Sequence, residues 1–435
     1  MVNIAFIVGK TSDVYPYKIT SRKAPLWLKK GMKPFMDYVN DFPDDPEENN
    51  TVPSDVAMAA YINYHHPHET ITLFNGAQVE ELTQQDLNEQ DVIFVIYDAI
   101  EVFHCGERKT CPFESHKFER MLAKTTAFVY PHPDFHKYII NKPNYYADLQ
   151  RADIPVAPFF KVTPNAVIKD PAKFKQRILN KGWKGAIIKP SYAGYSLGIK
   201  VLKDVSKTKV STINDHFKKL QKKGFPNAVV QEFVPSFAKN YEIRTYWINE
   251  RYAFSVGTLT EAVGGGGGLP ISDVDTFVSE GGTIPDSVAR QLKPVGRKAI
   301  RSILQYPIKH PMVRVDFGCC LSNDQCLEAY FINEVETMAA NMLADHTDYP
   351  VVERVAAAAY SFAKKVAARK NMKGWTPKVQ PLLKKPCKIR RPAKRRGSRK
   401  ASRKGSRKAS RKGSRKVSRK GSRKASRKGS RKAIK

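Results

Sequence analysis

Short apolar runs alternate with amphipathic stretches along most of the chain. Eight runs rich in Val, Ile, Phe and Tyr predict strands, at residues 2–8, 91–97, 127–130, 186–189, 228–233, 242–248, 313–318 and 330–334. The segments 118–125, 144–152 and 350–370 predict helices, the last of them with apolar residues on one helical stripe. Strands and helices mixed in this way, with short connections, indicate an α/β or α+β architecture.

Charge is distributed very unevenly along the chain. Of the 435 residues 41% are hydrophobic, which is enough to bury a sizeable core, and the formal net charge is +34. Residues 384–435 contain 27 Lys or Arg and no Asp or Glu, whereas residues 1–383 contain 48 basic and 41 acidic residues, a net charge of +7. We therefore expect a mildly basic folded body that carries a strongly basic appendage.

The appendage is a simple repeat. Nine tetrads, mostly Gly-Ser-Arg-Lys or Ala-Ser-Arg-Lys, run from Gly397 to Lys432, and one begins with Val417. Self-repulsion and low hydrophobicity predict that this tail is disordered. Four roles are open for it: nonspecific binding of nucleic acid or another polyanion, an import signal that includes residues 384–396, association with a virion, and phosphorylation of the serines.

Cysteine usage and hydropathy bear on the compartment. Six scattered cysteines are too few for a disulfide framework, so we expect reduced thiols in an intracellular location, the cytoplasm or, through the tail, the nucleus or a virion. No run of about 18 apolar residues occurs, so no membrane contact is expected. One group could bind zinc, although incidental placement in a loop is the simpler interpretation; its members are His104, Cys105, Cys111 and His116.

One segment has the composition of a phosphate-binding loop. Residues 185–198 read Gly-Ala-Ile-Ile-Lys-Pro-Ser-Tyr-Ala-Gly-Tyr-Ser-Leu-Gly, an apolar strand that ends at Lys189 and is followed by a loop with two glycines. Backbone N–H groups near glycine can approach phosphate oxygens closely, and a lysine adds a point charge. The Gly-Lys-Ser/Thr ending of a Walker A loop is absent, and a glycine-containing hairpin explains this segment equally well when it is taken alone.

Two later strands carry charged side chains in alternation with apolar ones. Arg314 and Asp316 are two residues apart, and so are Glu334 and Glu336. Residues i and i+2 of a strand share a face, so each pair is expected on a polar face backed by an apolar one. Three carboxylates on neighbouring strands repel one another unless a cation lies among them, and their oxygens suit Mg²⁺. For a single pair, a solvated sheet face is the simpler interpretation.

These three segments, and a fourth at residues 229–235 followed closely by 241–244, stand in an order and spacing that resemble the ATP-grasp superfamily, and most closely its carboxylate–amine ligases. These include the D-alanine–D-alanine ligases, the glutathione synthetases and the ribosomal-protein glutamate ligases. The D-alanine ligases carry Lys-Pro-Ser-x-x-Gly-Ser-Ser-x-Gly, Arg-x-Asp and Asn-Glu-Val-Asn-Thr, which residues 189–198, 314–316 and 333–337 resemble. The likeness covers roughly residues 125–350.

The resemblance implies a domain division. An N-terminal α/β domain is expected at residues 1–125. An ATP-grasp domain of two α+β subdomains that clamp ATP is expected at residues 126–375, and the disordered basic tail at residues 376–435. The glycine run 264–268 is either a lid over the site or a plain flexible insertion.

The resemblance also implies a role for each matched residue. Lys189 and Arg314 are the implied catalytic residues: Lys189, like Lys142, would contact ATP phosphates or the adenine edge, and Arg314 would clamp the transferred phosphoryl group or the acyl phosphate. The loop would close over the triphosphate, residues 231–234 would form the hinge that holds the adenine, and Glu242 would bind the ribose. The residues implied for ATP are Lys142, Lys189, Ser191, Gly194, Ser196, Gly198, Gln231, Glu232, Phe233, Val234 and Glu242. Those implied for two Mg²⁺ ions, with Mn²⁺ as a substitute, are Asp316, Glu334 and Glu336.

Three positions depart from the family pattern. Glu336 stands where Asn is usual, which adds negative charge to the metal site. Residues 338–345 lack the Pro-Gly turn and the serines that seat the acceptor carboxylate in the D-alanine ligases, which argues against a D-alanine substrate. Tyr195 stands in the loop where a small hydroxyl residue is common, so the packing of the loop is expected to differ.

The implied function is that of an ATP-dependent ligase. It would join a small acid to an amine, and the substrates would be amino acids or the end of a peptide or protein. The reaction would pass through an acyl phosphate and release ADP and phosphate. One alternative is an ATP-grasp kinase that phosphorylates a small molecule. Another is a nucleic-acid- or virion-associated protein with an inactive ATP-grasp domain, against which the intact Lys189, Arg314, Asp316 and Glu334 argue.

Overall fold

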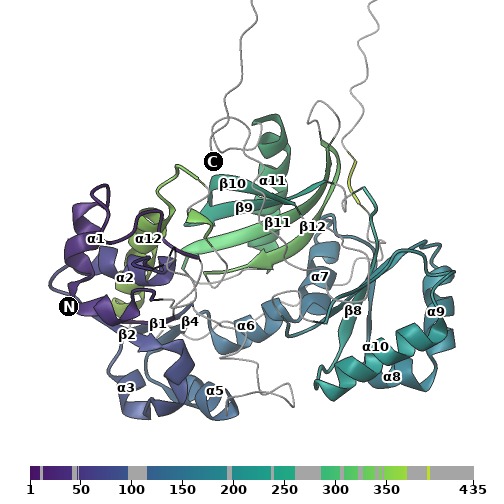
Figure 1. Cartoon of the computed structure of the whole chain (residues 1–435), viewed down its shortest axis with the longest axis horizontal. Coiled ribbons are helices and arrows are strands. Elements are labelled where there is room, and N and C mark those ends of the chain that lie inside the picture. The colour runs from purple at the N-terminus through teal and green to yellow at the C-terminus, as the bar shows by residue number, and fades with distance from the viewer. Residues whose placement is uncertain are drawn as a thin grey trace, which may run out of the picture. The chain divides into compact units, whose positions relative to one another are not determined.

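Three four-stranded sheets and the helices packed on them make up the described part of the chain (Figure 1). The computed structural model describes residues 1–9, 13–41, 47, 49–96, 115–193, 198–236, 240–259, 286–303, 308–321, 327–338, 342–344, 347–369 and 389–391. All of them lie in one compact unit, residues 1–392. The expected mixed architecture is confirmed, whereas the division at residues 125 and 375 stays a prediction.

The first sheet is parallel, in the order β2-β1-β3-β4. Alternate side chains of β1 face opposite sides, because successive residues of a strand do so: Phe6 belongs to the core on one side and Ile7 to the core on the other. The strands are β1 (Asn3–Val8), β2 (Thr70–Asn75), β3 (Val92–Val95) and β4 (Phe128–Tyr130).

Helices cover both faces of the first sheet. On the Phe6 side lie α1 (Leu26–Gly31), η1 (Lys33–Tyr38), α2 (Ser54–His65) and α12 (Val351–Ala367). On the Ile7 side lie η3 (Gly76–Glu81), α3 (Gln84–Asn88) and α5 (Ser115–Lys124).

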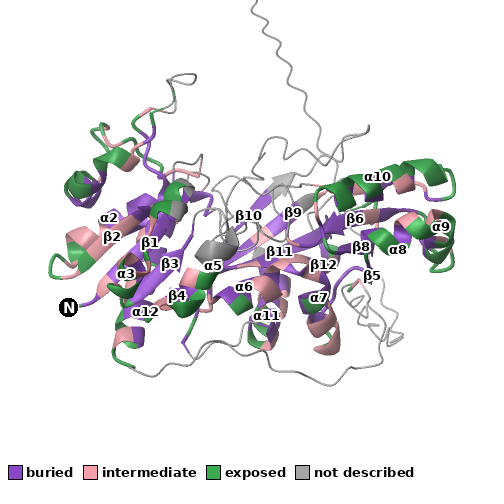
Figure 2. Cartoon of the chain, turned by 90° about the horizontal axis from the view of Figure 1, so that it is seen from below, coloured by how far each residue is buried: buried purple, intermediate pink, exposed green. Residues whose placement is uncertain are grey.

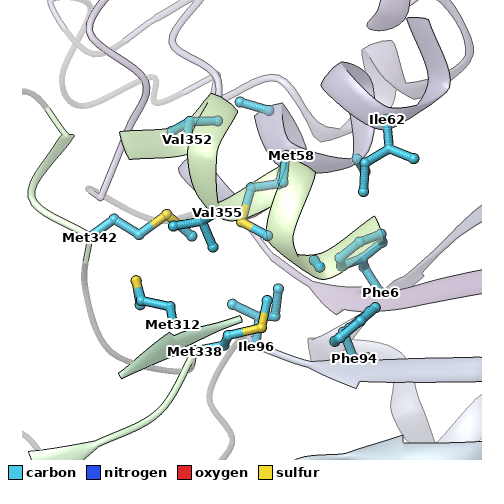
Figure 3. Close-up of a cluster of buried hydrophobic side chains, with 14 of the residues drawn as sticks. Phe6, Met58, Ile62, Phe94, Ile96, Met312, Met338, Met342, Val352 and Val355 are labelled. Atoms are coloured by element: carbon cyan, nitrogen blue, oxygen red, sulfur yellow. The ribbon is translucent and has the colours of Figure 1, made fainter. Parts of the chain in front are cut away.

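Helix α12 returns from the far end of the described chain to pack beside α2 (Figure 1). Figure 3 shows Val352 and Val355 of α12 facing a group of methionines, Met312, Met338 and Met342, together with Phe6 and Phe94 of the first sheet. This buried cluster therefore joins the first sheet to the strand that begins at Met312.

The second sheet is antiparallel, in the order β10-β9-β11-β12. Val313, Val315 and Phe317 lie in a core together with residues of three helices, so Arg314 and Asp316 occupy the opposite face. The strands are β9 (Tyr241–Ile248), β10 (Arg251–Leu259), β11 (Met312–Leu321) and β12 (Leu327–Glu336), and the helices are α6 (Pro133–Ile140), α7 (Lys142–Arg151) and α11 (Asp286–Ile303).

The third sheet is antiparallel, in the order β5-β8-β6-β7. Three amphipathic helices cover one of its faces and bury apolar residues such as Ile178 and Phe217 against it. The strands are β5 (Phe159–Val162), β6 (Ala186–Pro190), β7 (Lys200–Leu202) and β8 (Ala228–Glu232), and the helices are α8 (Pro164–Lys169), α9 (Pro171–Leu179) and α10 (Val210–Lys222).

All eight predicted strands and all three predicted helices are present, with ends shifted by a few residues. The eight predicted ranges do not include β2, β5, β7 and β10. All four are edge strands of their sheets, and the side chains of β2 are mostly half-buried, which weakens the contrast between apolar and polar positions. In the described part of the chain, no helix combines the length and the apolar character needed to cross a membrane.

The close contact between α1 and α2 allows a test of the packing. A Cβ atom on Gly31 would lie 2.1 Å from the backbone oxygen of Ala60. We expect Gly31→Ala to lower the free energy of unfolding by about 1–3 kcal/mol, as overpacking does, measured by urea denaturation. Lys30→Ala, at an exposed position of the same helix, is the control and should change stability by less than about 0.5 kcal/mol. Equal losses in the two variants would contradict the contact.

Candidate active site

Charged side chains of β11 and β12 face one another on the polar face of the second sheet. The strand register pairs Arg314 with Glu336 and Asp316 with Glu334. The guanidinium of Arg314 donates from Nε to Asp316 Oδ1 at 2.9 Å and from Nη2 to Oδ2 at 2.8 Å, and its Nη2 lies 3.0 Å from Glu336 Oε2. Arg314 and Asp316 are almost completely buried. Because burial disfavours the charged form, it raises the pKa of Asp316, and the neighbouring guanidinium opposes this.

Two lysines reach the same face from other elements. Lys142, the first residue of α7, places its Nζ 3.1 Å from Glu334 Oε1. Lys189 of β6 donates from Nζ to Asn333 Oδ1 at 2.7 Å. Burial would raise the pKa of Glu334, but the two lysines outweigh it and lower the pKa to about 2. Burial is also the largest influence on Lys189 and lowers its pKa to about 8, although nearby carboxylates oppose the shift.

A β-bulge brings Asn333 into the site. Phe317 pairs with Ile332 and Asp316 pairs with Glu334, so Asn333 is the extra residue on β12. Bulges redirect side chains, and this one places Asn333 on the charged face beside Glu334. Besides accepting from Lys189, Asn333 donates from Nδ2 to Glu242 Oε1 at 2.6 Å.

Strand β9 adds a carboxylate and a guanidinium. Arg244 pairs with Asp316 in the register, and its Nε and Nη2 each lie 3.3 Å from Glu242 Oε2. The family resemblance implies a role for Glu242 and none for Arg244. Arg244 is two residues from Glu242, and this spacing alone predicts that the two side chains share one face of the strand.

One tyrosine of α7 contacts the bulge, and a second tyrosine packs against the first. Tyr145 and Tyr146 are fully buried with ring centroids 4.7 Å apart, and the Tyr146 hydroxyl donates to the backbone oxygen of Asn333. The sequence analysis missed both. Their spacing of three and four residues from Lys142 places them on the same helix face as that lysine.

The start of the predicted phosphate loop is held by backbone and side-chain contacts. Ser191 is fully buried, and its hydroxyl donates to Asn227 Oδ1 at 2.6 Å. Gly198 has a φ of +73°, and a Cβ atom there would lie 2.9 Å from Leu220, so this position requires glycine. Gly194, Tyr195 and Ser196 lie outside the described residues.

The predicted adenine hinge is the end of β8. Gln231 and Glu232 are its last two residues, and Phe233 and Val234 follow directly. The backbone N–H of Glu232 donates to Pro158 O at 2.8 Å, and that of Phe233 donates to Gly185 O at 3.0 Å. These bonds fix the path of the backbone where β8 leaves the third sheet toward β9 and Glu242.

The donor types present fit the divalent ion that the resemblance implies. Asp316 and Glu334 are direct cross-strand partners, and carboxylates so placed can share a hard cation. Among the described residues, however, no group of three or more Asp, Glu, His or Cys is already arranged to hold a metal ion. Asp316 and Glu336 pair with Arg314, and Glu334 with Lys142. The assignments to metal and nucleotide stay predictions.

Three other groups of residues singled out in the sequence lie outside the described residues. His104, Cys105 and Cys111 lie outside the described residues, as does the side chain of His116. The glycine run 264–268 and the basic repeat also lie outside them.

Comparison with known proteins identifies the fold. No family model matches the sequence, and no curated protein matches it. A D-cycloserine synthetase is similar in structure, with a TM-score of 0.51 and 15% identity over 70% of this chain and 95% of that one. A D-alanine–D-alanine ligase from Bacillus anthracis, complexed with ATP, has a TM-score of 0.50 and 10% identity over 85% of this chain and 100% of that one. The chain has the ATP-grasp fold. The resemblance drawn from four short motifs is thereby confirmed at the level of the fold.

The buried ion pair of Arg314 and Asp316 in the candidate site allows a test of stability. Arg314→Leu leaves the buried carboxylate of Asp316 without its guanidinium, and we expect it to lower the free energy of unfolding by about 3–5 kcal/mol. The double variant Arg314→Leu/Asp316→Leu should lose less than the sum of the two single losses, because it leaves no unpaired charge at position 316. Chemical denaturation measures all three, with the exposed Arg251→Leu as control. Additive losses would contradict a coupled pair.

Proposed function

We propose that this chain is an ATP-dependent ligase that joins a carboxylate to an amine through an acyl phosphate and releases ADP and phosphate. The observation that carries the proposal is the convergence of Lys142, Lys189 and Arg314 on the polar face of β11 and β12, where Lys142 and Arg314 pair with carboxylates and Lys189 donates to Asn333. A carboxylate reacts poorly with an amine at neutral pH. Transfer of the γ-phosphoryl group converts it into an acyl phosphate, and the transfer requires cations around the moving charge.

Each cation of the site has a task in this proposal. Lys142 and Lys189 bind phosphate oxygens of ATP, and Arg314 neutralises charge on the transferred phosphoryl group and on the acyl phosphate. Asp316, Glu334 and Glu336 hold Mg²⁺, which supplies Lewis-acid stabilisation of phosphate oxygens when bound. The residues from Gln231 to Val234 hold the adenine, and Glu242 the ribose.

Charge balance supports the binding of the nucleotide together with its metal ions. The four cationic side chains, Lys142, Lys189, Arg244 and Arg314, meet four carboxylates, Glu242, Asp316, Glu334 and Glu336. ATP brings about four negative charges, and the two Mg²⁺ ions proposed for this site bring four positive charges, so the site stays neutral overall when all of them are bound. The phosphates then pair with the lysines, and Glu334 pairs with Mg²⁺ in place of Lys142. A site that took ATP without a metal ion would leave buried carboxylates unpaired, which is costly.

The substrates are proposed to be an amino acid or a peptide or protein end as the acid, and an amine. The synthetase and the ligase named above share the fold. The residues after β12 argue against D-alanine, because the Pro-Gly turn and the serines are absent from residues 338–345. A reducing intracellular location is part of the same proposal.

The reaction is tested by ADP and phosphate release from the full chain with Mg²⁺ and a panel of amino acids and dipeptides, given singly and in pairs. A ligase releases both products only when an acid and an amine are present together. Asp316→Asn should abolish release, and Lys30→Gln, at an exposed position of α1, should leave it unchanged. Release of ADP without phosphate on a single substrate would identify a kinase instead. A chain that binds no ATP would contradict both enzymes.

The lowered pKa of Lys189 predicts how nucleotide affinity depends on pH. The lysine is charged below its pKa of about 8 and neutral above it, and only the charged form attracts phosphate. The affinity for ATP should therefore fall as pH rises through about 8, by up to about tenfold per pH unit. Calorimetric titration between pH 6.5 and 9.5 measures this. Lys189→Arg keeps its charge throughout and should remove the dependence, whereas identical profiles for the two proteins would contradict it.

A further inference from the structure

The net positive charge of residues 1–383 comes from one subdomain, residues 159–225. Residues 159–225, which hold most of the third sheet and helices α8, α9 and α10, contain 16 Lys or Arg, three Asp and no Glu. The rest of residues 1–383 contains 32 basic and 38 acidic residues. The body outside this subdomain is therefore slightly acidic, and the subdomain is strongly basic.

Seven of these 16 cations lie on α8, α9 and α10, and Lys223 follows α10 directly. Helices α8 and α9 pack against α10, and the apolar side chains of all three point into the core over the third sheet. Their opposite surfaces are largely exposed (Figure 2). On α10 and the residue after it, Lys218, Lys219, Lys222 and Lys223 are all exposed. We call the exposed cationic side chains of α8, α9 and α10, together with that of Lys223, the basic helical face.

The three carboxylates of this region do little to neutralise it. Asp170 caps α9 by accepting from the backbone N–H of Lys173 at 2.8 Å, and Asp204 accepts from the Ser206 hydroxyl at 2.6 Å. Asp215 is the third, on α10. So many like charges on one surface destabilise the free protein through mutual repulsion, and they raise the local concentration of anions. A polyanion bound there relieves this repulsion.

We propose that the basic helical face binds the phosphate backbone of double-stranded nucleic acid without sequence preference. Its cations are nearly all lysines, which act as point charges and suit irregularly placed phosphates rather than base edges. Among the described residues 159–225, Val210 is the one exposed large apolar side chain. The face thus offers no aromatic platform for single-stranded bases and no apolar surface for a lipid bilayer.

The composition of the basic tail independently supports binding to nucleic-acid phosphates. Residues 384–435 lie almost wholly outside the described part of the chain, but their sequence has 27 cations, no acidic residue and no aromatic residue. Like the helical face, this composition offers phosphate contacts and nothing that recognises bases. The proposal goes beyond the ligase activity and does not depend on it, because none of its residues lies in the candidate active site.

The test measures binding of the full chain to a short fluorescein-labelled duplex DNA of arbitrary sequence by fluorescence anisotropy, in NaCl from about 50 to 200 mM. The variant Lys218→Gln/Lys219→Gln/Lys222→Gln/Lys223→Gln removes four charges from α10. Its log K against log salt slope should become shallower by about 0.9 for each lysine that contacts a phosphate, up to about 3 to 4 in total. Glutamine keeps helix propensity, so the fold is expected to be retained.

A matched control removes the same charge elsewhere. Lys23→Gln/Lys29→Gln/Lys30→Gln/Lys33→Gln changes four exposed lysines on and beside α1, and its salt slope should equal that of the unmodified chain. The tail is intact in all three proteins, so any difference belongs to the body. Circular dichroism verifies that both variants are folded.

Three results would overturn the proposal. The first is equal salt slopes in the α10 variant and the control, which would leave binding to the tail alone. The second is absence of duplex binding by the unmodified chain at the lowest salt. The third is displacement of the duplex by polyglutamate at a lower concentration of charge than by unlabelled duplex, which would assign the face to an acidic protein.

Discussion

The structure of the site depends on one constraint: charged groups placed on a buried sheet face must neutralise one another. The bidentate pair of Arg314 and Asp316 lies at the centre of the second sheet, where an unpaired charge would be costly. Glu336 of β12 adds a second carboxylate to Arg314, and Lys142 neutralises Glu334. Charged residues on three neighbouring strands therefore occupy one face, while the apolar residues between them build the core on the other.

The same face connects parts of the chain that are far apart in the sequence. Lys142 comes from the start of α7, Lys189 from the third sheet, and Asn333 from a bulge in β12. Asn333 is the junction, since it accepts from Lys189, donates to Glu242, and is held through its backbone by Tyr146. One extra residue in a strand thus links the loop-bearing sheet to the ribose-binding residue of the proposed site.

The fold is similar to that of solved ATP-grasp structures although only 10–15% of the residues are identical. A fold of this kind requires a pattern of buried positions and a strand register, and many different side chains can satisfy both. Hydrophobic cores tolerate the exchange of one apolar residue for another of similar volume. The charge on the outer surface is free of that requirement, so the basic helical face and the tail can differ from one ATP-grasp protein to the next without loss of the fold.

The sequence by itself determined the eight apolar strands and the pairing of charges two residues apart, because the period of a strand is local and readable. It also indicated the fold through four short motifs. Tertiary structure alone decided the rest. Only strand pairing opposed Asp316 to Glu334 and pushed Asn333 into the site, and only packing of α8, α9 and α10 assembled scattered lysines into one surface. The return of α12 to the first sheet had no local signal either. Contacts between residues far apart in the sequence depend on the whole set of buried faces, which no single segment encodes.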